Sequence, residues 1–541
     1  MPAILAIFAV LLLISALTSG LLAPPRGWDV LSYHLPRAVA WLQSGSLQPY
    51  GGNTAYYPGN GELLLLTLLF SGSDRLVSVV QLPFALLCAL ALYGTSRLLG
   101  AGRRSSLIVA MVLLTMPIIV FQSEIAKNDI VALAAIMCSL YFAARALNRT
   151  PSRVDGHLTP ITAGVAAGLA VGSRYPALPL VVAGVVLTLV LMPRRRDEQG
   201  AAKRRSRKTP VLAPLAVGAI LLPSLYWYAS NWVAAGNPLA PFAVRIGGAQ
   251  LWPGLDPVDV YGEQQFHYVR SAADWWWFAL RDRPLSGSYG ASAGFGAAFA
   301  ALVIPSALWM LAGVAGQKLR DCWRRRRLLV LSLTGVALIS WWVAGVRLPR
   351  YMLYAVVLPM PALGVLLESC RRSRRRAAEV LLVIAVAFSS LGSLLVLYSE
   401  KDLTSSFLGL RTKKDLYRMP SWVYSLPPGT KIALTRITDH QYYSTFRYPL
   451  VGSLPGNSVV MEGDVGTSFS IMRDGIRGMH DGLVADGVDY LFIRAFGLEP
   501  CRTNYELHPD LYEPVLDTAE SEYPWFRKGD PVLTKVYRVL P

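Results

Sequence analysis

A short polar stretch near the N-terminus carries residue types that acid–base chemistry uses. Positions 26–45 read RGWDVLSYHLPRAVAWLQSG and follow directly on an apolar run. Carboxylates and imidazoles are common general bases, and this stretch holds Asp29 and His34. Asp29, Tyr33 and Arg37 are spaced four apart, which places them on one face of a helix. Structural roles are the alternative: Asp29 as a helix cap and His34 as a plain hydrogen-bonding side chain.

The same stretch has an apolar stripe at helical spacing, formed by Leu31, Leu35, Ala38 and Leu42. With Trp41 added, the pattern predicts an amphipathic helix lying on the outer membrane surface, with Asp29 near the headgroups. Pro36 either kinks this helix or opens it.

A second polar stretch, FQSEIAKNDIVALAA from position 121, crowds Glu124, Lys127 and Asp129 into a short link between apolar runs. This crowding indicates a functional role for the three charges. The alternative is structural: Asn128 caps the following helix and Asp129 complements its dipole.

The elements that position these residues are membrane helices. The chain has 541 residues, of which 53% are hydrophobic and 16% charged, against about 25% charged in a soluble domain. We predict a polytopic α-helical membrane protein with about 11 transmembrane helices, each near the roughly 20 residues that cross a bilayer. The candidate spans are 3–23, 76–98, 107–122, 129–147, 158–173, 176–192, 211–230, 293–315, 328–346, 351–368 and 377–398.

The basic residues indicate the orientation. They cluster in tracts that begin at positions 102, 194, 320 and 370, between apolar runs. Cytoplasmic loops carry such an excess, so we predict a multi-pass protein of the plasma (inner) membrane with a cytoplasmic N-terminus. A nucleic-acid partner is not expected, because it would require a contiguous basic face on a folded domain. The five cysteines form no CxxC pair, so neither a zinc site nor a disulfide framework is indicated.

Three regions then lie outside the membrane: loops 24–75 and 231–290, and the segment 399–541. The last follows the predicted transmembrane domain, 1–398, which holds the candidate catalytic residues, and differs from it in composition. Apolar β-type runs, KIALTRI at 431 and VDYLFIRAF at 488, flank a helical pattern. Alternating signals of this kind predict an extracytoplasmic α/β domain.

Two arginines sit at the outer ends of predicted spans, Arg174 in VGSRYPAL and Arg350 in GVRLPRYMLY. Outer cations are unexpected under the positive-inside rule. With Lys127 they indicate a site for a lipid phosphate, to which arginine offers bidentate donors. The alternative for each arginine is snorkelling to the headgroups.

Six stretches follow one another along the first 400 residues: WDVLSYHLPRAVAWLQSGSL, NDIVALAAIMCSLYFAARA, GVAAGLAVGSRYPALPLVV, NWVAAGNPLAPF, GFGAAFAALVIPSALW and RLPRYMLYAVVLPMPALG. In the order and orientation of these stretches, the chain resembles the GT-C superfamily of integral-membrane glycosyltransferases over about residues 1–400. It is most similar to the branch with dolichyl-phosphate-mannose–protein mannosyltransferases and the aminoarabinose transferase of lipid A.

The resemblance implies transfer of a sugar from a polyprenyl-phosphate donor to an acceptor hydroxyl on the outer face, with inversion at the anomeric carbon. Asp29 would be the general base, and His34 would orient the acceptor or phosphate or complete a metal site. Lys127, Arg174 and Arg350 would neutralise the departing phosphate. Binding of sugar or acceptor would fall to Tyr33, Glu124 and Asp129.

Two features of this resemblance stay open. Many relatives carry an adjacent acidic pair, whereas Asp29 stands between Trp28 and Val30, so the need for a divalent metal ion is undecided. The second concerns the aromatic residues of loop 231–290, which form either a lid or sugar-stacking surface or an interfacial anchor. They are Tyr261, Phe266, Tyr268, Trp275, Trp276 and Trp277.

Two other function classes compete with the enzyme: a transporter or flippase for a lipid-linked sugar, and a non-catalytic cell-envelope assembly protein. A transporter typically shows paired halves and ionisable groups in mid-membrane, and neither is found in this sequence. The sugar, the acceptor (protein, lipid or glycan), the oligomeric state and the role of the C-terminal domain are not fixed by these residues.

Overall fold

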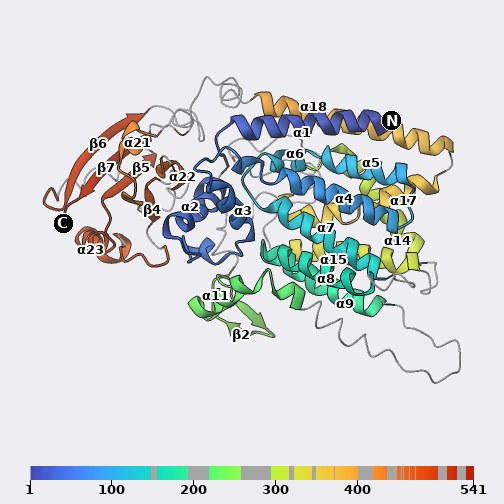
Figure 1. Cartoon of the computed structure of the whole chain (residues 1–541), viewed down its shortest axis with the longest axis horizontal. Helices are drawn as coiled ribbons and strands as arrows, with labels where there is room; N and C mark the ends of the chain where they lie inside the picture. The colour runs from blue at the N-terminus through green and yellow to red at the C-terminus, as the bar shows by residue number, and fades with distance from the viewer. Residues whose placement is uncertain are drawn as a thin grey trace.

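A helical bundle occupies one end of the molecule and a mixed β-sheet the other, with two short helices of the first loop between them (Figure 1). The computed structural model describes residues 2–27, 29–147, 155–192, 218–256, 294–315, 322–343, 349–370, 372–399, 417, 419–434, 447–452, 454, 456–461, 464–469, 471–496, 508–520 and 532–541. The bundle contains α1 (Pro2–Leu22), α4 (Leu82–Leu98), α5 (Arg103–Leu114), α6 (Pro117–Ser123), α7 (Asp129–Ala146), α8 (Asp155–Val171), α9 (Leu178–Leu191), α14 (Ile304–Ala315), α15 (Cys322–Val343), α16 (Leu353–Val357), α17 (Pro361–Ser369) and α18 (Arg372–Ser399).

Long apolar helices confirm a polytopic helical membrane protein. Within the described ranges, five helices are long and apolar enough to cross a bilayer: Pro2–Leu22, Val77–Leu98, Asp129–Ala146, Trp323–Val343 and Arg350–Ser369. A sixth span results if α5 and α6 are counted together across their 61° bend. Pro117 explains this bend, because a proline disfavours helical backbone in the residue before it, and Met116 is extended. The count of about 11 spans stays a prediction.

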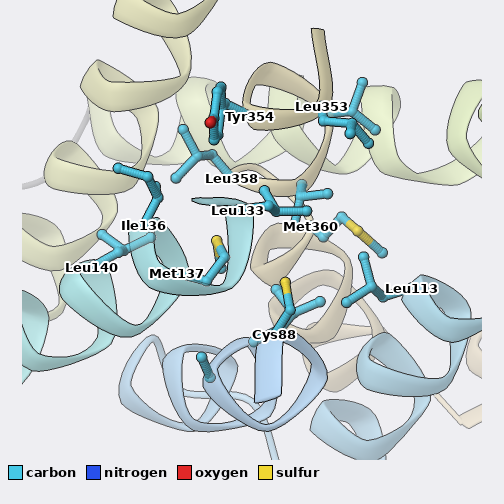
Figure 2. Packing of buried hydrophobic residues seen from close by; sticks show 14 of the residues in the cluster. Cys88, Leu113, Leu133, Ile136, Met137, Leu140, Leu353, Tyr354, Leu358 and Met360 are labelled. Carbon is cyan, nitrogen blue, oxygen red and sulfur yellow. The ribbon is translucent and has the colours of Figure 1, made fainter. Parts of the chain in front are cut away.

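The apolar core of the bundle lies where α4, α5, α7 and the 353–360 segment converge (Figure 2). Its side chains are almost fully buried, among them Cys88, Leu113, Leu133, Met137 and Met360. Small residues let the helices approach closely in such a core. At Gly94, for example, an added Cβ would lie 2.6 Å from the ring of Tyr141.

The first loop begins with a π-helical turn, η1 (Val30–His34), which leads into α2 (Leu35–Ser44). The amide of Leu35 donates to the carbonyl oxygen of Val30, five residues back. Pro36 stands at the start of α2 and has no amide hydrogen to continue an α-helical ladder through the turn. Of the two roles considered for Pro36, it therefore opens a helix.

The structure corrects the prediction of an amphipathic helix on the membrane surface. Side chains on several faces of α2 are buried, including Leu35, Arg37, Val39 and Trp41. The first loop also contains η2 (Asn53–Tyr56) and an apolar helix that the sequence pattern did not reveal, α3 (Asn60–Leu69). Neighbouring protein segments, rather than lipid headgroups, cover the apolar stripe.

The C-terminal part contains a five-stranded sheet in the order β4-β3-β5-β7-β6. β3 pairs in parallel with β4 and β5, whereas β7 is antiparallel to β5 and β6. The two runs predicted as strands form β3 and β5, and the helical pattern between them forms α23. The bounds are β3 (Lys431–Leu434), β4 (Ser458–Met461), α23 (Ile471–Ala485), β5 (Tyr490–Phe496), β6 (Tyr512–Glu520) and β7 (Val532–Val539). A separate domain starting at residue 399, outside the membrane, stays a prediction.

The sheet and the first loop share one apolar core. Val30, Leu31 and Leu35 pack in the same cluster as Ile432 and Tyr448. Hydrogen bonds reinforce this junction. The Tyr417 hydroxyl donates to the Pro25 carbonyl oxygen at 2.6 Å, and the Tyr448 hydroxyl donates to Asp74 at 2.5 Å.

A small hairpin, β1 (Val244–Ile246) and β2 (Ala249–Trp252), follows α11 (Leu225–Ala235). The six aromatic residues predicted as a lid, a sugar-stacking surface or an anchor lie outside the described residues.

Candidate active site

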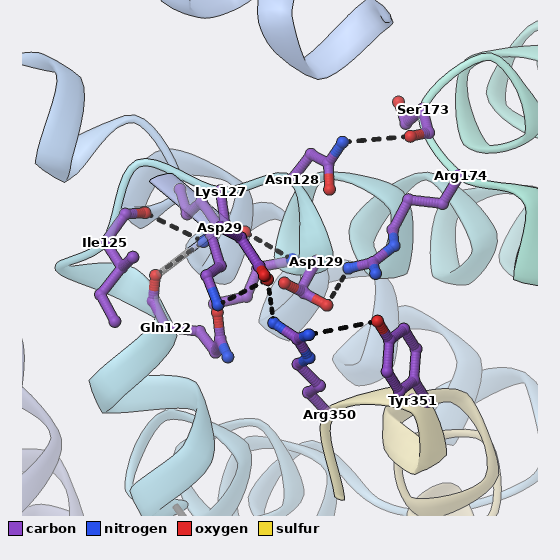
Figure 3. Close-up of polar contacts among 12 residues, drawn as sticks. Asp29, Gln122, Ile125, Lys127, Asn128, Asp129, Ser173, Arg174, Arg350 and Tyr351 are labelled. Carbon is purple, nitrogen blue, oxygen red and sulfur yellow. Dashed lines mark hydrogen bonds and ion pairs between the residues drawn. The ribbon is translucent and has the colours of Figure 1, made fainter. Parts of the chain in front are cut away.

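Asp29 lies at the entrance to the π-turn, and two cations share one of its carboxylate oxygens. Oδ2 lies 3.0 Å from Nζ of Lys127 and accepts a hydrogen bond from Nη1 of Arg350 (Figure 3). All three residues are buried, with exposed fractions of 6%, 2% and 7% for Asp29, Lys127 and Arg350. Asp29 makes no side-chain capping bond, so the structure does not support capping.

Three segments far apart in sequence bring these charges together. Asp29 comes from the first loop, Lys127 from the link between α6 and α7, and Arg350 from η7 (Pro349–Met352) ahead of α16. The buried Gln81 amide braces the link: it donates to the carbonyl oxygens of Gln122 and Ile125 and accepts from the amide of Ile130. No sequence pattern singled out Gln81.

Electrostatics keep Asp29 ionised. Burial alone would raise the pKa of Asp29, but the charges of Arg350 and Lys127 outweigh it and hold the pKa well below the usual value. Burial and the nearby charge of Arg350 lower the pKa of Lys127 to about 8, although Asp29 and Asp129 act in the opposite direction. Lys127 is therefore a cation that can lose its charge close to physiological pH.

A second ion pair, between Arg174 and Asp129, lies next to the first (Figure 3). The ring of Tyr351 connects the two: the guanidinium carbons of Arg350 and Arg174 lie 4.9 and 5.3 Å from its centroid. Nη2 of Arg350 also donates to the Tyr351 hydroxyl at 3.1 Å. Because both arginines are paired with buried carboxylates, the structure does not support snorkelling for them.

The link residue Asn128 stands at the N-cap position of α7 but makes no side-chain capping bond there. Its amide instead donates to the Ser173 carbonyl oxygen at 3.1 Å. Asp129 directs one oxygen to Arg174, and the other, Oδ2, is buried without a hydrogen-bond partner. These contacts tie the link to the turn after α8.

His34 is bound to a carboxylate that sequence reasoning missed. Nδ1 of His34 lies 2.7 Å from Oε1 of Glu62, and the two side chains are only 4% and 1% exposed. Glu62 stands in the first turn of α3, in the stretch PGNGELLLL. A lone acidic residue opening an apolar helix was the available signal, but helix-dipole stabilisation explains such a residue equally well.

Tyr33 is half-buried beside the charged centre. Its ring packs against His34 and Tyr57, with centroid distances of 4.2 and 6.2 Å. Burial and the negative charge of Asp29 raise the pKa of Tyr33 well above the usual value, so its hydroxyl stays neutral.

Glu124 belongs to a separate contact. It is fully buried, and Oε1 lies 2.8 Å from Nη2 of Arg26. The structure thus joins Asp29, Lys127, Arg350, Asp129 and Arg174 and pairs Glu124 elsewhere. A sugar-binding role for Glu124 stays a prediction that this geometry does not favour.

The described side chains provide few ligands for a metal ion. Across the described ranges, no three His, Cys, Asp or Glu side chains converge to hold an ion. One carboxylate oxygen of Asp29 and one of Asp129 already pair with Lys127, Arg174 and Arg350. A divalent cation needs several oxygen ligands, so these residues do not fit one in this arrangement.

The centre matches the chemistry of a phosphate. Its three cations, Lys127, Arg174 and Arg350, face two carboxylates, Asp29 and Asp129, which leaves one positive charge in excess. Arginine and lysine donors neutralise charge on transferring or departing phosphates.

Comparisons with known proteins identify one matching family model and several similar solved structures. Residues 70–235 match the family model of dolichyl-phosphate-mannose-protein mannosyltransferases. ArnT from Cupriavidus metallidurans bound to undecaprenyl phosphate has a similar structure, with a TM-score of 0.56, 14% identity, and coverage of 98% of this chain and 97% of ArnT. Its apo form gives a TM-score of 0.54 with the same identity and coverage.

The arabinofuranosyltransferase AftD from Mycobacteria is also similar, with a TM-score of 0.51 and 13% identity over 99% of this chain and 41% of AftD. No curated protein sequence gives a significant match.

Proposed function

The chain has the GT-C fold of integral-membrane glycosyltransferases, and from this premise we propose that it transfers a sugar from a polyprenyl-phosphate donor to an acceptor hydroxyl on the outer face of the membrane. Mannosyl transfer is the activity named for the matching family model, and undecaprenyl phosphate is the lipid bound to ArnT. Both support a lipid-phosphate-linked donor. The sugar, hexose or pentose, and the acceptor, protein, lipid or glycan, are left to experiment.

One observation carries the proposal: Lys127 and Arg350 converge on a single carboxylate oxygen, and Arg174 lies against the same Tyr351 ring as Arg350. The donor's phosphate oxygens can replace that carboxylate oxygen as the partner of both cations. In the absence of donor, Asp29 thus occupies the place where the phosphate binds.

This exchange also explains how Asp29 becomes a base. Clamped between two cations, its carboxylate is a weak proton acceptor. Once the donor phosphate takes Lys127 and Arg350, the main interactions that lower the pKa of Asp29 are lost. Asp29 then accepts the proton of the acceptor hydroxyl, a contribution of typically about 10²–10⁴-fold.

The transfer is a single displacement. The acceptor oxygen forms a bond to the anomeric carbon while the bond from that carbon to the phosphate oxygen breaks, which inverts the anomeric centre. The electron pair stays on the leaving polyprenyl phosphate, whose charge Lys127, Arg174 and Arg350 neutralise. Tyr33 and Asp129 border this centre and are assigned to the sugar or acceptor. No step is assigned to a metal ion.

We place the reaction in the inner membrane with the charged centre outside. The basic tracts between spans support this orientation. A reporter fused after Pro541 should be accessible to an impermeant probe in intact cells, and so should one inserted between α8 and α9 near Arg174. A reporter in the basic tract at 194 should be protected. The opposite pattern contradicts the orientation.

The decisive assay uses the purified chain in liposomes with undecaprenyl phosphate carrying radiolabelled mannose, glucose or arabinose. Membranes from cells that lack the chain supply acceptors. An enzyme moves label from the lipid donor into acceptor, whereas a flippase moves the donor across the bilayer without forming a new glycosidic bond. A scaffold does neither. If no hexose or pentose donor yields labelled acceptor, the proposed function is wrong.

A further inference from the structure

The helix α11 presents an apolar face to the outside of the protein. Its exposed positions include Leu225, Ala229, Trp232 and Val233, which follow one another at helical spacing and therefore share one face. Trp232 and Val233 are 55% and 87% exposed. A helix on a water-covered surface normally turns its polar side chains outward, so this face is typical of an element that contacts lipid or another protein.

The opposite face of α11 carries hydrogen-bonding side chains. Nε1 of Trp227 donates to Oδ1 of Asn60 at 2.7 Å. Nδ2 of Asn231 donates to the Tyr56 carbonyl oxygen at 2.8 Å and to the Tyr175 hydroxyl at 2.9 Å. These bonds fix α11 to the first loop and to the turn after α8, so its apolar face is held in a defined position.

The hairpin β1–β2 extends the apolar face. The ring centroids of Trp232 and Trp252 lie 6.0 Å apart, which joins the helix and the hairpin into one surface. Leu251 of β2 is exposed, and Gly247 and Gly248 make the tight turn between the strands with positive φ angles. Figure 1 shows α11 and β2 projecting from the side of the molecule. We refer to α11 with this hairpin as the α11–hairpin unit.

The composition of the α11–hairpin unit suits the boundary between membrane and water. Between Lys208 and Arg245 the sequence contains no Asp, Glu, Lys, Arg or His. Arg245 itself pairs with Asp256 at 2.8 Å. Tryptophan and tyrosine are enriched at this boundary because each ring has an apolar body and a polar tip, and Tyr226 and Trp232 are both exposed.

The apolar face continues onto the bundle. An added Cβ at Gly168 of α8 would lie 2.2 Å from the Ile220 carbonyl oxygen, so the segment before α11 packs on the last turns of α8. Leu169 of α8 and Leu222 are exposed beside this contact. α8 in turn packs along α7, which is long and apolar enough to cross the membrane. The exposed face is therefore continuous with the lipid-facing surface of the bundle, at the end that carries the charged centre.

α11 is too short to cross a bilayer. Its 11 residues extend about 16 Å at about 1.5 Å per residue, whereas the hydrocarbon core is about 30 Å thick. A short helix with one apolar face lies in the plane of the interface, with that face about 5–10 Å into the boundary between headgroups and acyl chains.

We propose that the α11–hairpin unit docks on the lipid leaflet at the side of the charged centre, with Trp232, Val233 and Leu251 inserted among the acyl chains. Since Asn231 is bonded to Tyr56, the docked unit anchors the first loop to the membrane. The sequence pattern placed a surface helix in the first loop itself, and the structure gives that position to α11. This inference goes beyond the proposed function and does not depend on it.

Photo-crosslinking to lipid tests the docking. The photoreactive residue p-benzoylphenylalanine replaces Val233 or Leu251, and the chain is irradiated in liposomes of phosphatidylethanolamine and phosphatidylglycerol. Intact mass should show the addition of one phospholipid at either position. Val186, exposed on α9, is the positive control, and Val484, exposed on α23 at the other end of the molecule (Figure 1), should give no lipid adduct.

A charge on the apolar face should undo the docking. Val233→Glu should lower the yield of lipid adduct at Leu251 by about tenfold, because a carboxylate is costly among acyl chains. Since Val233 is highly exposed, this variant should keep the wild-type Tm in detergent. Val484→Glu is the matched control and should leave the yield unchanged.

Three results would overturn the proposal. The first is the absence of lipid adducts at positions 233 and 251 in liposomes where position 186 forms them. The second is crosslinking of these two positions to a second copy of the chain in place of lipid. The third is an unchanged yield at position 251 in the Val233→Glu variant.

Discussion

At the scale of single residues, the proposed mechanism gives Lys127 and Arg350 two competing partners. Asp29 pairs with both cations in the free protein, and in our proposal the donor phosphate competes with Asp29 for them. Removing one member of a buried ion pair typically costs about 3–5 kcal/mol, because a charge is left uncompensated. The donor phosphate can supply the missing negative charge, and two predictions follow from this competition.

Asp29→Asn should abolish transfer yet bind bare undecaprenyl phosphate more tightly than the wild type. The substitution removes the carboxylate with which the phosphate must compete. Binding of radiolabelled undecaprenyl phosphate measures the affinity, and the rise in Tm on adding the lipid should be larger for the variant. Asp464→Asn is the control, since it breaks the buried Arg447–Asp464 pair of the C-terminal part. Asp464→Asn should lower Tm without changing the affinity for the lipid. Weaker lipid binding by Asp29→Asn than by the wild type would refute the competition between Asp29 and the phosphate.

Lys127 should impose an alkaline limit on activity. Its pKa of about 8 means that it loses its positive charge, and with it the attraction for phosphate, as the pH rises through 8. Since kcat/KM reports groups of the free enzyme, kcat/KM for the donor should fall by up to tenfold per pH unit above that value. Lys127→Arg should remove this fall, because arginine stays charged. A wild-type profile that is flat from pH 7 to 10 would contradict the assignment.

At the scale of elements, the site depends on how α3 meets the link before α7. Gly61 precedes Glu62 and touches Asn128, the neighbour of Lys127. Glu62 and the proposed phosphate ligand Lys127 thus each stand beside one member of a tight contact between Gly61 and the Asn128 side chain. In the sequence, Gly61 is one of two glycines in PGNGELLLL, and its importance becomes visible once the two segments are in contact.

Gly61→Ala should therefore impair both stability and activity. The added Cβ would lie 2.4 Å from Cβ of Asn128, and overpacking of this kind costs about 1–3 kcal/mol. We expect a lower Tm and a reduced kcat/KM. Gly335→Ala in α15 is the matched control, because an added Cβ there meets no atom within 4 Å. Unchanged Tm and activity in Gly61→Ala would show that the contact is not needed.

At the scale of the whole molecule, the C-terminal sheet is part of the support of the site. The apolar core under the π-turn contains Val30 and Leu31 from the first loop together with Ile432 and Tyr448 from the C-terminal part. Without the sheet, these first-loop side chains would face solvent or lipid headgroups. The π-turn that places Asp29 and His34 would then lose much of its packing.

A chain that ends at residue 399 should consequently be inactive and poorly folded in its first loop. Size-exclusion chromatography in detergent and limited proteolysis would show this, with cleavage concentrated in 24–75. Tyr448→Phe, which removes the 2.5 Å hydrogen bond to Asp74, is the milder test and should cost about 1 kcal/mol. A truncated chain with wild-type transfer activity would show that the sheet serves another purpose.

The sequence by itself determined that this is a polytopic helical membrane protein, and it supplied polar residues as candidates for the site. Long apolar runs require helices that satisfy their own hydrogen bonds in lipid, so the polytopic character and the main helices were predictable from residue type alone. Asp29 could be chosen as a candidate because its residue type suits acid–base chemistry, and Lys127 and Arg350 because cations are unexpected on the outer side of the membrane. The runs at 431 and 488 identified two strands. These features depend on local composition and spacing.

Only the tertiary structure decided which charges meet. Asp29 and Arg350 are 321 residues apart, and no local pattern indicates that they form one ion pair while Glu124 joins Arg26. The π-turn escaped prediction because it departs from α-helical spacing where Pro36 interrupts the ladder. Glu62 was missed because its role requires contact with His34, 28 residues earlier. Pairing of buried charges is a property of distance and burial, which a linear chain does not contain until it folds.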